Sequence, residues 1–311
     1  MLWQSRARDG LILTSSSDRL TDPPYLLQRA ARRGELVRLR QGAYCSAEVW
    51  ANAGPRERHV LRVRAVVAQS MDRVVVAGVS AGALWGFPIE GSWPEEVTLL
   101  HAPRSGGKSE PGVRRTSAGA DGAETETVGG IVATSVARTA LDLARGRDFP
   151  IAVGMLDWAR WRKNPQRVPL SELRSQLVSA RFRTGAIGLD RAVEFSTSLS
   201  ASFYESKARA SMELLGFEAP ELQRTFVDAE GVIEPDYFWR GADVAGEFDG
   251  RSKYADVRFS NGDPAKVFWQ EKRREDRLRR MVRTVVRIVA ADVDSPRRLE
   301  RLLRDAGIPR R

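Results

Sequence analysis

Cysteine and histidine are scarce in this chain of 311 residues, which contains one cysteine, Cys45, and two histidines, His59 and His101. A lone cysteine cannot form an internal disulfide bond or a cysteine-based zinc site. Two histidines are too few for HNH-type nucleases and for Cys/His hydrolases. The sequence also lacks both a run of about 18 apolar residues and an apolar N-terminal signal, so we expect a cytoplasmic protein without a membrane partner.

Positive charge is in excess. The chain has 50 Lys and Arg against 40 Asp and Glu, which gives a formal net charge of +10 at pH 7. A basic protein of this kind most commonly has nucleic acid as its acidic partner. With 42% hydrophobic and 29% charged residues, the composition is that of a globular protein, and the length allows two or three domains.

Acidic residues interrupt two strand-like apolar segments, residues 233–239 and 244–250. Residues two apart in a strand share a face, so Glu247 and Asp249 project together. If Asp236 lies on the neighbouring strand, three carboxylates converge, and a proton or a divalent cation must relieve their repulsion. Such oxygen ligands suit Mg²⁺ or Mn²⁺. The alternative is that these residues cap turns or face water, since Asp249-Gly250 is also a turn signal.

Helical patterns flank these strands. Residues 202–216 predict a helix that carries Glu205 and Arg209 on one face, and residues 264–281 predict a basic helix that begins on a proline. Residues 284–290 predict a final buried strand. The predicted order is therefore helix, three strands, helix, strand.

This order resembles the PD-(D/E)XK nuclease superfamily over roughly residues 199–305, with Pro235-Asp236 on the second strand and Glu247-x-Asp249-Gly250 on the third. The branch related to very-short-patch repair endonucleases is the most similar. The resemblance implies that Asp236 and Glu247 bind the metal, that Glu205 supports them, and that a lysine stabilises the reacting phosphate. Asp249 occupies the usual lysine position, so the candidates are Lys253 and Lys272, and loss of activity is the alternative.

A helix followed by a basic hairpin is predicted near the N-terminus. Residues 25–34 predict a short helix that ends on glycine, and residues 35–44 predict two strands around a Gln-Gly turn. This order is typical of a winged helix, and the alternative is a small helical hairpin with a solvated basic face. The candidate DNA-binding residues here are Arg29, Arg32, Arg33, Arg38 and Arg40.

Residues 34–44, Val79 to Gly86 and Val132 to Leu143 are similar to the AbiEi-type antitoxin family. The similarity covers roughly residues 8–160. It implies a winged helix that binds DNA, often the operator of its own gene, followed by a mixed domain.

The middle of the chain is less informative. Residues 74–78 and 96–101 predict strands, and Ser80 to Trp85 predict a short helix with Ser80 as its N-cap. Residues 103–127 are rich in Gly, Ser and Glu and predict an exposed polar loop.

Together these patterns predict a mixed α/β (α+β) protein. We expect a winged-helix domain at residues 1–50, a middle α/β domain at 51–160, a helical connector at 161–198, and an αβββαβ restriction-endonuclease-like core at 199–311.

Two functions compete. The first is a Mg²⁺-dependent DNA endonuclease of phage defence or a toxin–antitoxin system, and the second is a catalytically inactive DNA-binding antitoxin or transcriptional regulator. Arg273, Arg274 and Arg277 on the basic helix are further candidate DNA contacts. The expected partners are DNA, a cognate toxin or defence-system protein, and a second copy of the chain.

Overall fold

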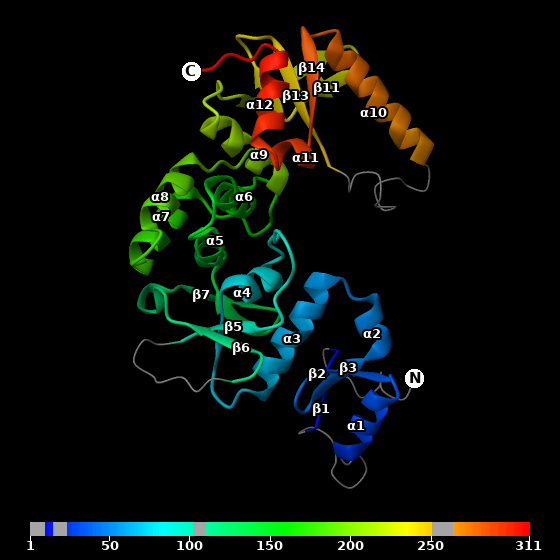
Figure 1. Cartoon of the computed structure of the whole chain (residues 1–311), viewed down its shortest axis with the longest axis vertical. Coiled ribbons are helices and arrows are strands. Elements are labelled where there is room, and N and C mark those ends of the chain that lie inside the picture. Colours follow the sequence, from blue (N-terminus) through cyan, green and yellow to red (C-terminus); the bar gives the residue numbers. More distant parts are fainter. Residues whose placement is uncertain (1–9, 15–23, 102–109, 251–263) are drawn as a thin grey trace. The chain divides into compact units, whose positions relative to one another are not determined.

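The computed structural model describes residues 10–14, 24–101, 110–250 and 264–311 of the chain (Figure 1). It has a mixed α/β fold, as predicted, and divides into two compact units. The first unit is Met1–Arg145 with Val168–Ile187, and the second is Gly146–Arg167 with Gly188–Arg311. The expected connector is therefore divided, because α7 (Leu170–Ala180) belongs to the first unit and most of α8 (Ala186–Phe195) to the second.

The N-terminal part of the first unit is the predicted helix and hairpin. Leu27 and Ala30 of the helix pack against Leu36 and Tyr44 of the hairpin, so the opposite face of the helix is left for charged residues. A third short strand pairs with the hairpin, in the order β1-β3-β2. The elements are β1 (Ile12–Leu13), α1 (Pro24–Arg32), β2 (Leu36–Arg40) and β3 (Ala43–Ser46).

A five-stranded sheet of order β6-β5-β4-β8-β7 forms the centre of the rest of the first unit. Its strands are β4 (Val75–Val76), β5 (Val97–Leu100), β6 (Val113–Thr116), β7 (Thr125–Val128) and β8 (Ile131–Thr134). The remaining elements are α2 (Ala47–Asn52), α3 (Pro55–Gln69), α4 (Gly78–Trp85), the 3-10 helix η2 (Ala120–Gly122) and α5 (Val136–Ala144).

Two local predictions in this unit are wrong. The segment 103–127 is not a loop throughout: β6 pairs in parallel with β5 and buries Val113, and β7 pairs with β8. Residues 103–109 of it lie outside the described residues. Ser80 is not an N-cap, because α4 begins two residues earlier, after Ala77. Ser80 is instead buried, and its hydroxyl accepts a hydrogen bond from the Thr98 N–H at 2.8 Å.

The second unit has a sheet of order β14-β13-β12-β9, in which β13 and β14 are parallel and the other pairs are antiparallel. A helix precedes these strands and another connects the parallel pair, which is the predicted order with one extra hairpin. The strands are β9 (Glu221–Leu222), β10 (Phe226–Asp228), β11 (Gly231–Ile233), β12 (Tyr237–Trp239), β13 (Val244–Asp249) and β14 (Thr284–Val289). The helices are α6 (Phe149–Arg160), α9 (Phe203–Leu214), α10 (Pro264–Arg279), α11 (Ala290–Val293) and α12 (Pro296–Asp305), besides α8.

Helices cover both faces of this sheet. Tyr237 and Phe248 on one face pack against Met212 of α9 and Leu303 of α12. On the other face, Phe238, Ala245 and Val285 pack against Leu278 of α10. Alternation along β13 therefore places Glu247, two residues from Ala245, on the α10 face. No helix in the described residues is both long and apolar enough to cross a membrane.

Candidate active site

The pairing of β12 with β13 brings Asp236 and Glu247 together. Tyr237 pairs with Gly246 in the antiparallel register, so the next step places Asp236 opposite Glu247. Residues directly opposite each other on antiparallel strands point to the same face, with Cβ atoms about 5 Å apart. The backbone N–H of Phe248 donates to Asp236 Oδ2 at 2.7 Å, which holds that carboxylate beside β13.

Arginines neutralise the carboxylates of β13. Glu247 Oε2 accepts from Arg274 Nη2 of α10 at 2.5 Å, and the Glu247 side chain is 8% exposed. Asp249 Oδ2 accepts from Arg287 Nη1 at 3.1 Å. Arg287 also contacts Glu275 of α10 and holds the pKa of that carboxyl below its ordinary value. The α10 face of the sheet thus carries alternating positive and negative groups.

Arg287 is a residue that the sequence analysis missed. It stands in register with Glu247 on the parallel strand β14, so both side chains share a face. A signal was available, because an arginine within the apolar strand Thr-Val-Val-Arg-Ile-Val needs a partner if it is buried.

Neither lysine candidate lies at the carboxylates in the described part of the chain. Lys272 is exposed on α10, with its Nζ 5.3 Å from the centre of the Trp269 ring. Lys253 lies outside the described residues. Among the described residues, Arg274 contacts Glu247 and Arg287 contacts Asp249.

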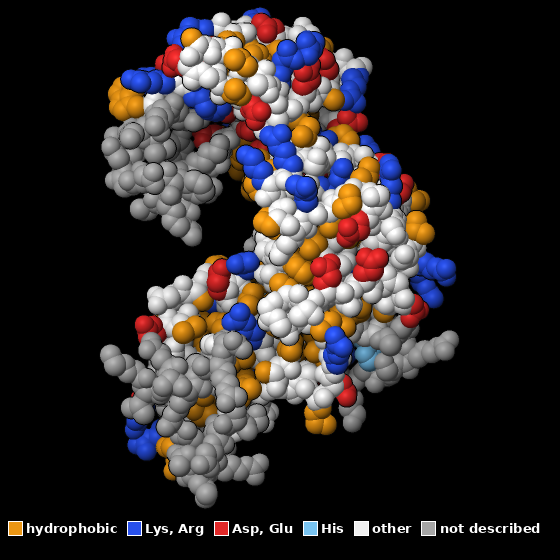
Figure 2. Space-filling model, turned by 180° about the vertical axis from the view of Figure 1, so that it is seen from behind, with side chains coloured by type: hydrophobic (Ala, Val, Ile, Leu, Met, Phe, Trp, Pro, Cys, Tyr) orange, Lys and Arg blue, Asp and Glu red, His pale blue; other side chains and the backbone are white. Residues whose placement is uncertain are grey.

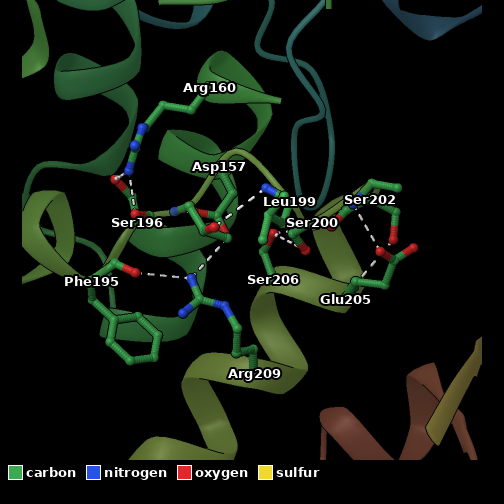
Figure 3. Close-up of polar contacts among 12 residues, drawn as sticks. Asp157, Arg160, Phe195, Ser196, Leu199, Ser200, Ser202, Glu205, Ser206 and Arg209 are labelled. Carbon is green, nitrogen blue, oxygen red and sulfur yellow. Dashed lines mark hydrogen bonds and ion pairs between the residues drawn. The ribbon is translucent and has the colours of Figure 1, made fainter. Parts of the chain in front are cut away.

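Glu205 lies in the first turn of α9, which packs against the opposite face of the sheet from Arg274. Its Oε2 accepts from the Ala201 N–H at 2.8 Å, while Ser202 Oγ accepts from the Glu205 N–H at 3.2 Å (Figure 3). Glu205 is thus a capping residue of α9. In the residues that the structure describes, no three His, Cys, Asp or Glu side chains form a group that could hold a metal ion.

A buried ion pair positions the helix that carries Glu205. Arg209 Nη2 contacts Asp157 Oδ2 of α6 at 3.0 Å, and its guanidinium lies 4.0 Å from the centre of the Phe195 ring (Figure 3). Asp157 also accepts from the Thr197 N–H at 2.6 Å. Arg209 therefore joins α9 to α6 and does not act beside Asp236.

The donor chemistry at Asp236 and Glu247 suits a hard divalent cation, because two carboxylates stand opposite each other on one face. In this structure Arg274 occupies one oxygen of Glu247. A cation at this site must therefore compete with a guanidinium for Glu247.

The predicted DNA-binding arginines of the first unit are mostly exposed. Arg29 and Arg32 lie on the outer face of α1, Arg33 lies in the turn that follows it, and Arg38 lies on β2. A cavity of about 330 Å³ between the helix and the hairpin is lined by Gln28, Ala31, Arg32, Arg38 and Tyr44. Arg40 differs, because it forms an ion pair with Glu110.

The arginines of α10 in the second unit are less available for DNA binding than the sequence suggests. Arg274 contacts Glu247 of the sheet, and Arg277 faces the β10–β11 hairpin, where its Nε donates to Asp228 Oδ2 at 2.8 Å. This ion pair raises the pKa of Arg277 and lowers that of Asp228. Arg273 and Lys272 remain exposed. Figure 2 shows Lys and Arg side chains interspersed with Asp and Glu on the visible surface of this unit.

Comparisons with known proteins give similarities in sequence and in structure. No protein-family model matches the chain. Two proteins of Mycobacterium tuberculosis, Uncharacterized protein MT2308 of strain CDC 1551 / Oshkosh and Uncharacterized protein Rv2248 of strain H37Rv, are each 28% identical over 264 residues, which is 84% of this chain and 88% of theirs. The crystal structure of the RV2827C protein from the same species aligns with 74% of this chain and 90% of that chain, at 16% identity and a TM-score of 0.39.

Proposed function

We propose that the chain binds DNA and that its second unit hydrolyses phosphodiester bonds with Mg²⁺ or Mn²⁺. The observation that supports this most is the opposition of Asp236 and Glu247 across β12 and β13, on the face covered by the basic helix α10. The two adjacent carboxylates provide ligands for a cation, and the arginines of α10 provide hydrogen-bond donors for a phosphate.

Each residue has a definite task in this proposal. Asp236 and Glu247 hold the cation, which when bound polarises the phosphate and lowers the pKa of a water. Arg274, once released from Glu247, donates to the phosphate oxygens as negative charge builds on them. Arg287 remains with Asp249 and Glu275 and fixes the position of α10 relative to β13.

A plasmid-nicking assay tests this function. Supercoiled plasmid is incubated with the purified chain and Mg²⁺ or Mn²⁺, beside the variants Glu247→Gln and Asp236→Asn. We expect nicking by the natural chain and a loss of about 100-fold in each variant, the usual effect of removing one group that stabilises a transition state. Glu230→Gln is the matched control, because this exposed carboxylate lies on the β10–β11 turn. Undiminished nicking by Glu247→Gln would contradict the proposal.

A second candidate function is DNA binding without cleavage. The ion pair between Glu247 and Arg274 favours it, as does an aspartate at position 249 where the resemblance calls for lysine. DNA retardation in gels without nicking at any Mg²⁺ or Mn²⁺ concentration would support this function over the first.

The biological setting that we propose is phage defence or a toxin–antitoxin system. It rests on the similarity of residues 8–160 to AbiEi-type antitoxins, and it implies a cognate toxin or defence-system protein as a partner. Loss of phage protection, or of toxin neutralisation, on deletion of the gene would support it. A chain that self-associates would also bind paired DNA half-sites.

A further inference from the structure

A cavity of about 1130 Å³ lies wholly within the first unit. Its walls are the end of β6, the segment that contains η2, the end of α7 and the residue that follows α5. Four arginines and one acidic residue line it, namely Arg115, Arg145, Arg181, Arg183 and Asp121. This lining is strongly positive, and none of the functions considered above uses it.

The walls are held by close backbone packing. A Cβ atom at Gly119 would lie 2.4 Å from the carbonyl oxygen of Ala180, and one at Gly122 would lie 1.9 Å from that of Ser179. Only glycine fits at such separations. The fully buried Arg138 donates to the carbonyl of Gly119 at 2.6 Å and contacts Asp142 at 3.0 Å. The cavity is therefore preorganised on the side of η2.

The arginines are available to a ligand. Arg181 and Arg183 are exposed and form no ion pair with any described residue, and Arg115 contacts Glu110 only at 3.5 Å. Arg145 donates weakly to Thr184 Oγ1 at 3.4 Å, while its buried Nε has no hydrogen-bond partner among the described residues. Guanidinium groups that lack a carboxylate partner are donors for an anion.

The lining favours phosphate groups over an aromatic base. Phe182 is the adjacent ring, but it is buried and has the guanidinium carbons of Arg138 and Arg145 at 5.1 and 5.0 Å from its centre. It is therefore not free to stack on a base. Guanidinium groups bind phosphate oxygens in pairs, and hydroxyls of Thr116, Ser117 and Thr184 add further donors.

We propose that this cavity binds a small ligand with two or more adjacent phosphate groups. The volume is that of a small-molecule site, and the excess of three positive charges matches a diphosphate or triphosphate. The site is separate from the carboxylates of the second unit and does not depend on nuclease activity.

Calorimetric titration of the full chain with inorganic pyrophosphate tests the proposal, with orthophosphate as the weaker reference. We expect saturable binding that Arg183→Ala and Arg181→Ala each weaken by about tenfold, the usual effect of losing one charged hydrogen bond. Asp121→Asn should strengthen binding severalfold, because it removes the acidic group. Arg73→Ala is the matched control, an exposed arginine of the same unit outside the cavity.

Three results would overturn the proposal. The first is no binding of pyrophosphate at millimolar concentration, and the second is equal weakening by Arg73→Ala. The third is weakening of duplex DNA binding, but not of pyrophosphate binding, by the Arg181 and Arg183 variants, which would assign these arginines to a nucleic-acid surface. Both residues are exposed, so their loss should leave folding intact, and thermal melting of each variant checks this.

Discussion

The surroundings of His59 favour the neutral form of its ring. This histidine is fully buried, with Nδ1 2.8 Å from the carbonyl oxygen of Pro94 and Nε2 2.9 Å from Ser80 Oγ. A carbonyl only accepts, so Nδ1 donates to Pro94 and Nε2 accepts from Ser80 in the neutral ring. Burial lowers the pKa of His59, and the charge of Arg62 lowers it further.

The first prediction follows from the lowered pKa of His59. The unfolded chain takes up the proton near pH 6.5, whereas the folded chain resists it to lower pH, so the unfolded state binds more protons below pH 6.5. Stability should therefore fall as the pH drops from 7.5 to 5.5. Urea unfolding at both pH values measures it, and His59→Gln should show a smaller difference than the natural chain. An equal difference would exclude His59 as the cause.

The second prediction concerns which basic side chain acts beside Asp236 and Glu247. Lys272 points away to Trp269, whereas Arg274 contacts Glu247, so Arg274→Ala should reduce plasmid nicking more than Lys272→Ala or Lys253→Ala. Arg274→Ala also removes the competitor for Glu247, so it should bind Mg²⁺ more tightly in a calorimetric titration. Tighter Mg²⁺ binding with unchanged nicking would limit Arg274 to the role of competitor.

Sequence periodicity predicts some site residues well and their partners poorly. The period of two in a strand was sufficient to place Glu247 and Asp249 on one face. The capping role of Glu205 could also have been predicted, because Ser202-x-x-Glu205 is the capping-box spacing. Arg209 and Asp157 are 52 residues apart and meet through the packing of α6 on α9, which no local pattern contains.

At the scale of elements, helix α1 carries the most direct DNA-binding prediction. Arg29 and Arg32 lie on its exposed face, and their combined replacement by Ala should reduce the discrimination of the full chain between DNA sequences. Arg273→Ala on α10 should weaken binding to all sequences alike and reduce the salt dependence by about one unit of log-log slope. Fluorescence anisotropy with a selected and a scrambled duplex measures both effects.

The opposite pattern, with Arg273 controlling discrimination, would place sequence recognition on α10. Equal binding by the α1 double variant would instead support the alternative of a helical hairpin whose basic face is only solvated.

Apolar strands were predicted more reliably than polar strands. The strand β6 reads Val-Arg-Arg-Thr, and Val113 is the one buried side chain in it. Its place in the sheet comes from backbone pairing with β5, which side-chain composition does not reveal. For the same reason the end of β6, a wall of the arginine-lined cavity, could not be predicted from the sequence.

At the scale of the whole molecule, the chain passes between the two units three times, after residues 145, 167 and 187. The sequence gives little sign of these crossings, because α7 and α8 read as one polar helical region. Helix α7 nevertheless completes the first unit, where Gln176 accepts from the Glu124 N–H at 3.2 Å and the end of the helix packs on Gly119.

The fourth prediction is that a fragment of residues 1–187 is more stable than one of residues 1–160. Both fragments contain α6 without its partner α9, so their difference isolates α7 and the residues around it. Leu173 and Gln176 of α7 are fully buried, so removal of the helix exposes the side chains that they cover, and we expect the melting temperature to fall by several degrees. Equal melting temperatures would mean that α7 is not part of the first cooperative unit.

The three crossings also determine the order in which the chain can fold during synthesis. The ribosome makes residues 1–145 first, but the first unit lacks α7 until residue 187 has followed. Meanwhile α6 has left the exit tunnel with its apolar side uncovered, and α9, which covers it, is complete only at residue 214. At roughly 5–20 residues per second this interval lasts several seconds, during which the nascent chain exposes a surface that a chaperone would bind.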